Sequence, residues 1–571
     1  MRYFRMLSNA VAGGALGAAF LTVLVLQLNP QIPLGWWTVW PLYWRIALFY
    51  ASHLTVGFYA LLVIRQLFGR TIHSPGWLSF RILSWIGTLV VSVAAALMWF
   101  NASGFQAVLD QDTIRRLAAG AGATTVCAVL LAIITIVHYS FGRRGSRVGG
   151  TLLVLTLVAS LLFPVTARGW GKPRPLPSRL LDLDVVEAED PPGPRVVMIL
   201  LDGASLDYVS LETAEGRLPN IARILAGGAS MHLTTVQPTQ PAPVWAAVAT
   251  GKYPQKNGIR AASGYAYAKD RPMIELLPDL CFAHALVHFG MLRQVPHRST
   301  SILARPIWSI LSREHVSSGV LGWPVTTPAL PLRGFLITDT YRQPAFGTPD
   351  DLTLGYPAYA VASALMTDAL AAGAAPPRTL EHPPLARDAH YRRLADILGA
   401  QIPTRFFAVR YEGLDQAGHL FLRYALPRAF GDVSEEEQQR YGGVLDEHYA
   451  YIDTVIGDAI ESLRPDDLLL IVSGFGMEPV SLGKRLLAAV LTQPSVTGTH
   501  ERAPDGFLLA YGGAVRPGRL PLGAVVDVAP TILYFLGLPV ARDMDGSART
   551  DIFAPAFLTA KPITFIPTYE R

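Results

Sequence analysis

The chain has few cysteines for its length. It contains two in 571 residues, Cys127 and Cys281. Cys127 falls in a long apolar run and Cys281 in the more polar C-terminal part, so no disulfide can form within that part. A disulfide-stapled scaffold is therefore excluded, and the C-terminal part must be stabilised by a hydrophobic core of its own.

Charge is also sparse. Charged residues make up 16% of the chain, and only six of the 48 basic residues are lysines. The formal net charge is +5, and no basic patch with interleaved aromatic residues is evident. We therefore expect no nucleic-acid partner.

Apolar residues, in contrast, are abundant. They make up 51% of the chain, the mean hydropathy is +0.32, and the excess lies in the first third. Most of the apolar runs there are long enough to cross a hydrocarbon layer of about 30 Å. We expect five transmembrane helices in a membrane domain over residues 1–165, with the runs at 11–28, 46–68, 80–100, 117–138 and 151–165.

Arginines are concentrated on one side of these predicted spans. Loops on that side should face the cytoplasm, which places the N-terminus inside and everything beyond residue 165 outside the cytoplasm. The prediction is a bacterial inner-membrane protein with a periplasmic or extracellular C-terminal domain. The arginines that support it are Arg2, Arg5, Arg65, Arg70, Arg81, Arg143, Arg144 and Arg147.

The C-terminal part is predicted to be one α/β domain. Residues 166–195 are rich in proline and charge and predict an extended linker, and the domain covers 196–571. Apolar runs at 196–203, 405–413 and 467–476 predict buried parallel strands, with a helix over 445–463 and His448 on its surface. Strands alternating with helices indicate a mostly parallel sheet with helices on both faces, in which ligands bind at the carboxyl ends of the strands.

Acidic and histidine side chains follow the predicted strands. Asp202 ends the first strand, Asp415 and His419 follow the second in "DQAGH", and His500 lies in "TGTHERAPDG". Carboxylate and imidazole groups are ligands of divalent ions such as zinc. Asp415, His419 and His500 would form a three-ligand site with one open position, although an Asp and a His four apart on a helix also occur as a solvated pair.

Seven stretches in order resemble one enzyme family. They include "VVMILLDGAS", "PVWAAVATGKYPQKNGI", "GLDQAGHLFLRY" and "GTHERAPDGFLLAYG". Over residues 196–553 the chain resembles the type I phosphodiesterase and nucleotide pyrophosphatase family of the alkaline phosphatase superfamily. The resemblance implies an alkaline-phosphatase-like fold, two metal ions, commonly zinc, and a Thr or Ser nucleophile at a helix N-terminus. It places Asp415, His419 and His500 in one metal site and Asp202 in the other.

The chain departs from the family pattern around the second ion. The nucleophile position, four residues before Trp245, is Pro241, and Thr239 lies two residues further back. The family's "SDHG" corner, which supplies an Asp and a His, reads Ser473, Gly474, Phe475 and Gly476. The losses cluster on one site, and we expect Phe475 to fill the space of the second ion.

Three functions follow from this pattern. The first is a pseudoenzyme with at most one metal that binds a phosphorylated or envelope ligand. The second is an active phosphodiesterase or phosphoryl transferase that uses the single metal or Thr239. The third is membrane transport or lipid handling, with the lipid bilayer as partner and the C-terminal domain as an accessory.

Overall fold

The computed structural model divides the chain into two compact units. It describes residues 1–68, 75–140, 147–171, 192–278, 283–339, 355–374, 383–483, 485, 496–500 and 504–571. The helical unit comprises Met1–Pro175 and Ser263–Pro296, and the sheet unit comprises Leu176–Ala262 and His297–Arg571. Cys281 and residues 172–191 of the predicted linker lie outside the described residues.

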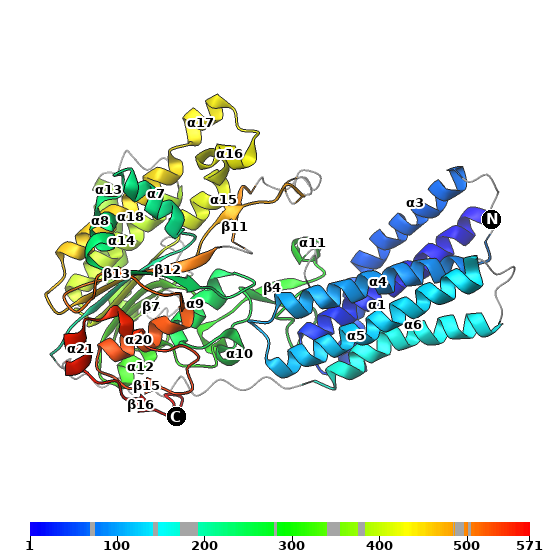
Figure 1. Cartoon of the computed structure of the whole chain (residues 1–571), viewed down its shortest axis with the longest axis horizontal. Helices are drawn as coiled ribbons and strands as arrows, with labels where there is room; N and C mark the ends of the chain where they lie inside the picture. The colour runs from blue at the N-terminus through cyan, green and yellow to red at the C-terminus, as the bar shows by residue number, and fades with distance from the viewer. Residues whose placement is uncertain are drawn as a thin grey trace. The chain divides into compact units, whose positions relative to one another are not determined.

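Within its described residues, the helical unit contains five helices long and apolar enough to cross a membrane, as predicted (Figure 1). Their exposed faces carry large apolar side chains such as Val126 and Leu155. This is expected for helices surrounded by lipid instead of water. The second span runs through a π-helical turn. The bounds are α1 Arg2–Leu28, α2 Trp36–Ile46, η1 Ala47–Ala51, α3 Ser52–Phe68, α4 Phe80–Gly104, α5 Gln111–Ile134, η2 Thr135–Ser140 and α6 Arg147–Arg168.

A segment from the C-terminal part of the sequence also belongs to the helical unit. It contains the antiparallel strands β3 (Ser263–Ala266) and β4 (Arg293–Pro296) and helix α11 (Ala283–His288). Asn29, which is fully buried, accepts hydrogen bonds from the backbone N–H groups of Glu275 at 2.7 Å and Leu276 at 3.0 Å. The predicted boundaries at 165 and 196 did not anticipate this excursion of the chain.

The sheet unit is built on a mixed sheet with the strand order β13-β2-β12-β9-β1-β8-β5-β6-β7, and β14 pairs with β2. Strands β9, β1, β8, β5 and β6 are parallel, and β12 runs antiparallel beside β9. The predicted mostly parallel sheet is thus confirmed. The bounds are β1 Val196–Leu201, β2 Ala229–Thr234, β5 Ser318–Trp323, β6 Gly334–Thr338, β7 Gly355–Tyr356, β8 Phe406–Tyr411, β9 Leu468–Phe475, β12 Asp505–Tyr511, β13 Gly518–Arg519 and β14 Gly523–Ala524.

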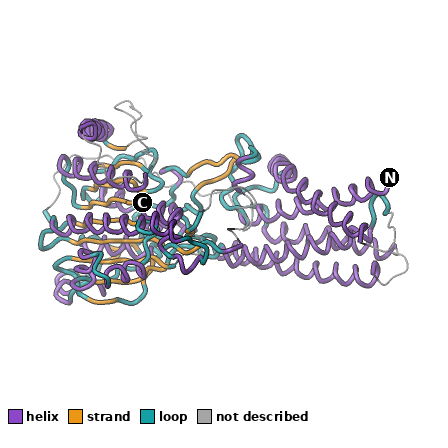
Figure 2. Tube along the Cα trace, turned by 90° about the horizontal axis from the view of Figure 1, so that it is seen from above, coloured by secondary structure: helices purple, strands orange, loops and turns teal. Residues whose placement is uncertain are grey.

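Helices cover both faces of this sheet, as Figures 1 and 2 show. Ile199 and Leu201 of β1 pack into one apolar core with α7 (Leu206–Ala214), α8 (Pro219–Gly227) and α18 (Val444–Glu461). The remaining helices of the sheet unit are α9 Pro241–Thr250, α10 Pro254–Asn257, α12 Ile307–Arg313, α13 Ala358–Ala374, α14 Pro383–Gln401, α15 Gly413–Ala425, α16 Pro427–Phe430, α17 Glu435–Tyr441, α20 Val528–Phe535 and α21 Pro555–Ala560, with the 3₁₀ turns η3 Ser299–Ser301, η4 Val525–Asp527 and η5 Thr550–Ile552. Short strand pairs are β10 Glu478–Pro479 with β11 Gly498–Thr499, and β15 Val540–Ala541 with β16 Phe565–Ile566.

The predicted surface position of His448 is wrong. This residue is 1% exposed on the inner side of α18, and its Nδ1 atom is 2.8 Å from the carbonyl oxygen of Val444. An imidazole can enter an apolar core when one ring nitrogen bonds to the helix backbone, so its polarity alone did not reveal which face of the helix it occupies.

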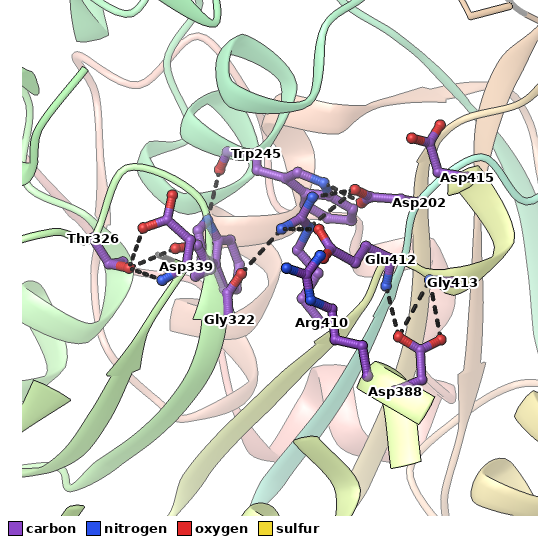
Figure 3. A network of polar contacts seen from close by, with 12 residues as sticks. Asp202, Trp245, Gly322, Thr326, Asp339, Asp388, Arg410, Glu412, Gly413 and Asp415 are labelled. Atoms are coloured by element: carbon purple, nitrogen blue, oxygen red, sulfur yellow. Dashed lines mark hydrogen bonds and ion pairs between the residues drawn. The ribbon is translucent and has the colours of Figure 1, made fainter. Parts of the chain in front are cut away.

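A buried carboxyl group holds the start of α15 in place. Asp388 on α14 accepts hydrogen bonds from the backbone N–H groups of Glu412, at 3.2 Å, and Gly413, at 3.1 Å (Figure 3). These are among the N–H groups that a helix leaves without partners at its N-terminus. Burial raises the pKa of Asp388 to about 8, although the Gly413 N–H opposes the rise.

This raised pKa predicts a pH-dependent stability. Because the folded-state pKa of about 8 lies above the ordinary value of 3.8, stability from the protonated carboxyl is present at low pH and is lost as pH rises between these values. The Tm of wild type relative to Asp388→Asn should therefore fall from pH 5 to pH 9, because Asn cannot ionise. A Tm difference independent of pH would contradict this assignment.

Candidate metal centre

The carboxyl ends of β1 and β8 converge on the predicted site. Asp202 follows β1 directly, and β8 leads through Glu412 into α15, which carries Asp415 in its first turn. Gly203, with φ +71°, permits the two segments to approach, because a Cβ atom at this position would lie 2.9 Å from Asp415 Cα. The backbone of this corner thus requires glycine.

Asp415, His419 and His500 lie together. His419 Nε2 is 3.5 Å from Asp415 Oδ2, and His500 Nε2 is 3.9 Å from Asp415 Oδ1. One candidate ligand atom from each residue lies within 4.8 Å of the other two. His419 comes one helical turn after Asp415 on α15, and His500 arrives from the end of β11.

Backbone carbonyl groups orient both histidine rings. His419 Nδ1 is 2.8 Å from the Gly498 oxygen, and His500 Nδ1 is 3.0 Å from the Thr239 oxygen. Since a carbonyl oxygen only accepts, each Nδ1 carries a proton, and each Nε2 faces Asp415. A hydrogen bond from Nδ1 to a backbone carbonyl oxygen is the usual arrangement for a histidine that binds a metal through Nε2.

The chemistry of these donors fits a divalent cation. Ligands held about 2 Å from a tetrahedral ion are about 3.3 Å apart, which is a few tenths of an ångström below the distances between Asp415 and the histidines. Asp415 Oδ1 is buried and has no hydrogen-bond partner. Burial lowers the pKa of His419, but the hydrogen bond and charge of Asp415 raise it more, to above its ordinary value.

Asp202, which was predicted to bind the second ion, is bonded to protein donors through both of its oxygens. Its Oδ1 accepts a hydrogen bond of 2.6 Å from Trp245 Nε1, and its Oδ2 accepts one of 3.0 Å from Arg410 Nε and a second from the same guanidinium (Figure 3). Asp202 is fully buried. Burial raises the pKa of Asp202, and the Arg410 charge opposes the rise.

Arg410 is the functional-site residue that sequence reasoning missed. It lies on β8 opposite Leu200, donates to the Gly322 oxygen at 3.2 Å and is 3.5 Å from Glu412. Burial lowers the pKa of Arg410, but the charge and hydrogen bonds of Asp202 raise it more, so the guanidinium keeps its proton. The available signal was a charged side chain inside the otherwise uncharged strand "FFAVRY".

The glycine-rich corner at the end of β9 is closed by neighbouring side chains. A Cβ atom at Gly474 would lie 2.5 Å from Val244 Cγ1, so no larger side chain fits there without movement. Phe475 is fully buried, with its ring centre 5.0 Å from that of His500. Ser473 Oγ donates to the carbonyl oxygen of Ala204 at 2.8 Å, which fixes the backbone of the corner.

The predicted nucleophile position is occupied by Pro241 at the start of α9. Pro243 follows two residues later, so two of the first three residues of this helix have no N–H group. Thr239 lies just before the helix and is fully buried, and its hydroxyl has no hydrogen-bond partner. Its carbonyl oxygen bonds to His500, which brings Thr239 to the edge of the candidate metal centre.

Solved structures of murine and human phosphodiesterases are similar to part of the chain. An inactive variant of murine ectonucleotide pyrophosphatase / phosphodiesterase 5 in complex with AMP is 14% identical, with a TM-score of 0.39, and the match covers 63% of this chain and 100% of that one. The human protein is 16% identical, with a TM-score of 0.38 and 63% and 99% covered. No curated protein matches the chain.

A sequence model of one family matches residues 196–500, which is more than half of the chain. This match includes Asp202, Arg410, Asp415, His419 and His500. The chain belongs to the type I phosphodiesterase / nucleotide pyrophosphatase family.

Proposed function

We propose that this protein is a membrane-anchored family member that binds a phosphorylated ligand at a single metal ion and has lost the covalent phosphoryl-transfer step. The observation that carries the proposal is the engagement of Asp202 by Arg410 and Trp245. The ion would be held by Asp415, His419 and His500. Asp202 would pair with Arg410 instead of binding a second ion.

Electrostatics supports one ion rather than two. The Arg410 guanidinium is fixed beside Asp202, where a second cation would have to bind. At about 4 Å and an effective dielectric constant of about 20, a divalent ion and a guanidinium repel each other by about 8 kcal/mol. With Gly474 and Phe475 in the corner, no further carboxylate or imidazole is supplied there to offset this repulsion.

The start of α9 supports loss of phosphoryl transfer. A helix N-terminus stabilises a phosphoryl group chiefly through its free N–H groups. In α9, Pro241 has neither a hydroxyl group nor an N–H group, and Pro243 lacks an N–H group as well. Ala242 alone offers a backbone donor among the first three residues.

The remaining centre suits a phosphate ester as ligand. A divalent ion bound by one carboxylate and two neutral imidazoles keeps a net charge of +1, which attracts an anionic oxygen to the open position. Zinc fits this donor set and polarises a phosphoryl oxygen when bound. The family supplies the class of ligand, and an envelope component carrying phosphate would satisfy it.

The helical unit serves as the anchor. The excess of arginine in alternate loops supports an N-terminus in the cytoplasm and a sheet unit in the periplasm or outside the cell. Within this proposal the helices of residues 1–165 hold the domain at a bacterial inner membrane.

One observation favours hydrolysis as a second candidate. Thr239 has a buried hydroxyl without a partner, and its own carbonyl oxygen is bonded to the candidate ligand His500. A hydroxyl beside a bound cation acts as a nucleophile in other enzymes, and Thr239 would supply one in place of the missing residue. This candidate makes the protein an active hydrolase with a displaced nucleophile.

Metal content tests the single-ion centre. The purified full-length protein should contain one tightly bound divalent ion per chain by elemental analysis. His500→Ala should reduce the content below about 0.2 per chain, because two ligands hold zinc far more weakly than three. His232→Ala on β2, outside the centre, is the matched control and should keep the ion. Two ions per wild-type chain would exclude the proposal.

A double-mutant cycle tests the Asp202–Arg410 pair. Arg410→Met leaves a buried carboxylate without its cation and should lower the free energy of unfolding by about 3–5 kcal/mol. The double variant Asp202→Asn, Arg410→Met should recover much of this loss, because no unpaired charge remains. Additive effects in denaturant unfolding would show that the two residues do not act as a pair.

Activity separates the two candidates. With bis(p-nitrophenyl) phosphate and zinc, we expect no turnover above the blank. If turnover appears, is lost in Thr239→Ala and is kept in Thr235→Ala, the hydrolase candidate is correct and the binding proposal fails.

A further inference from the structure

A polar cavity lies within the helical unit, far along the sequence from the candidate metal centre. It occupies about 180 Å³ between the end of α1, the start of α5 and the end of α6. All of its lining residues belong to the helical unit. They include Gln27, Arg116, Arg168 and Trp170.

Arg168 places a buried positive charge at this cavity. It is 5% exposed and donates to the carbonyl oxygens of Leu26, Ile32, Asn29 at 2.8 Å and Gly169 at 3.2 Å. Within the described part of the chain, no carboxylate pairs with it. The carbonyl groups at the end of α1 offset about half of a unit charge. The rest of the Arg168 charge is left for a bound anion to balance.

Gln27 indicates that something polar occupies the cavity. It is 3% exposed, and neither its amide nitrogen nor its oxygen has a hydrogen-bond partner. Burying such an amide without partners is strongly unfavourable. The side chain is seated against Gly120, where a Cβ atom would lie 2.5 Å from Gln27 Nε2. If Arg168 only capped the end of α1, its burial would be explained, but the buried Gln27 amide without partners would not be.

Arg116 adds a second guanidinium to the lining. It is 3.1 Å from Asp112 and donates to the Arg168 carbonyl oxygen at 3.2 Å, so its charge is largely balanced while its donors remain near the cavity. Trp170 is 84% exposed, which is typical of a tryptophan at the edge of a bilayer.

The donors and acceptors of the cavity define the ligand. The charge of Arg168, which no described carboxylate balances, favours an anion, and the unpartnered Gln27 Nε2 requires an acceptor. Gln27 Oε1 requires a donor, and Arg116 is close enough to the cavity to donate to the same anion. A phosphate group accompanied by a hydroxyl supplies both. We propose that this cavity binds such a phosphate, as a phospholipid head group or as free hydrogen phosphate.

The test is a stability titration of the full-length protein in a neutral detergent. Either phosphatidylglycerol or inorganic phosphate should raise the Tm in a saturable way, by mass action on the folded state. If only phosphatidylglycerol raises the Tm, the ligand is a phospholipid head group. If inorganic phosphate also raises the Tm to saturation, the ligand is the free ion. Diacylglycerol, which lacks phosphate, is the negative arm.

Matched variants locate the effect in the cavity. Gln27→Leu and Arg116→Gln should each weaken the apparent affinity by about tenfold or more, since each removes a hydrogen bond to a charged group. Arg115→Gln, which removes an exposed neighbouring charge, should leave it unchanged. The proposal is overturned if neither phosphate source binds, if diacylglycerol acts equally, or if both cavity variants bind like wild type.

Discussion

The buried pairing of Asp202 with Arg410 is the interaction on which the candidate site depends. A carboxylate at the end of a central strand is costly to bury, and the family resemblance implies that a divalent ion would offset that cost. Here a guanidinium on the neighbouring strand neutralises it, assisted by the Trp245 indole. Such a pair is stable as long as both partners are present, and removing one alone would strand the other.

Several neighbouring features are consistent with this exchange of charge. A Cβ atom at Gly474 would clash with Val244, and Phe475 packs against His500. Pro241 begins the helix that would present the nucleophile. Under the proposed function, each feature would withhold a ligand, a donor or space from a second ion. Asp415, His419 and His500 lie close enough together to hold one ion.

The strands were predictable because each has a strong local signal. Buried parallel strands read as apolar runs, and β1, β8 and β9 fall within a residue or two of their predicted bounds. The grouping of Asp415 with His500 came from family resemblance. Arg410 was missed because its pairing depends on the register of β1 against β8, which local sequence does not encode.

The excursion formed by Ser263–Pro296 was missed for a similar reason. Its apolar residues, such as Ile274 and Leu286, look like those of any core, and only their partners, including Val25 and Ile46, show that they belong to the helical unit. His448 shows the same limit for a polar residue, whose burial is decided by a backbone partner. In each case the missing information was tertiary.

The central claim is that one cation site remains and that a guanidinium occupies the place of the other. Anomalous diffraction at the zinc edge, from crystals grown with zinc, tests it most directly. The account predicts one peak among Asp415, His419 and His500, with Arg410 still bonded to Asp202. A second peak within bonding distance of Asp202, with Arg410 displaced, would contradict it.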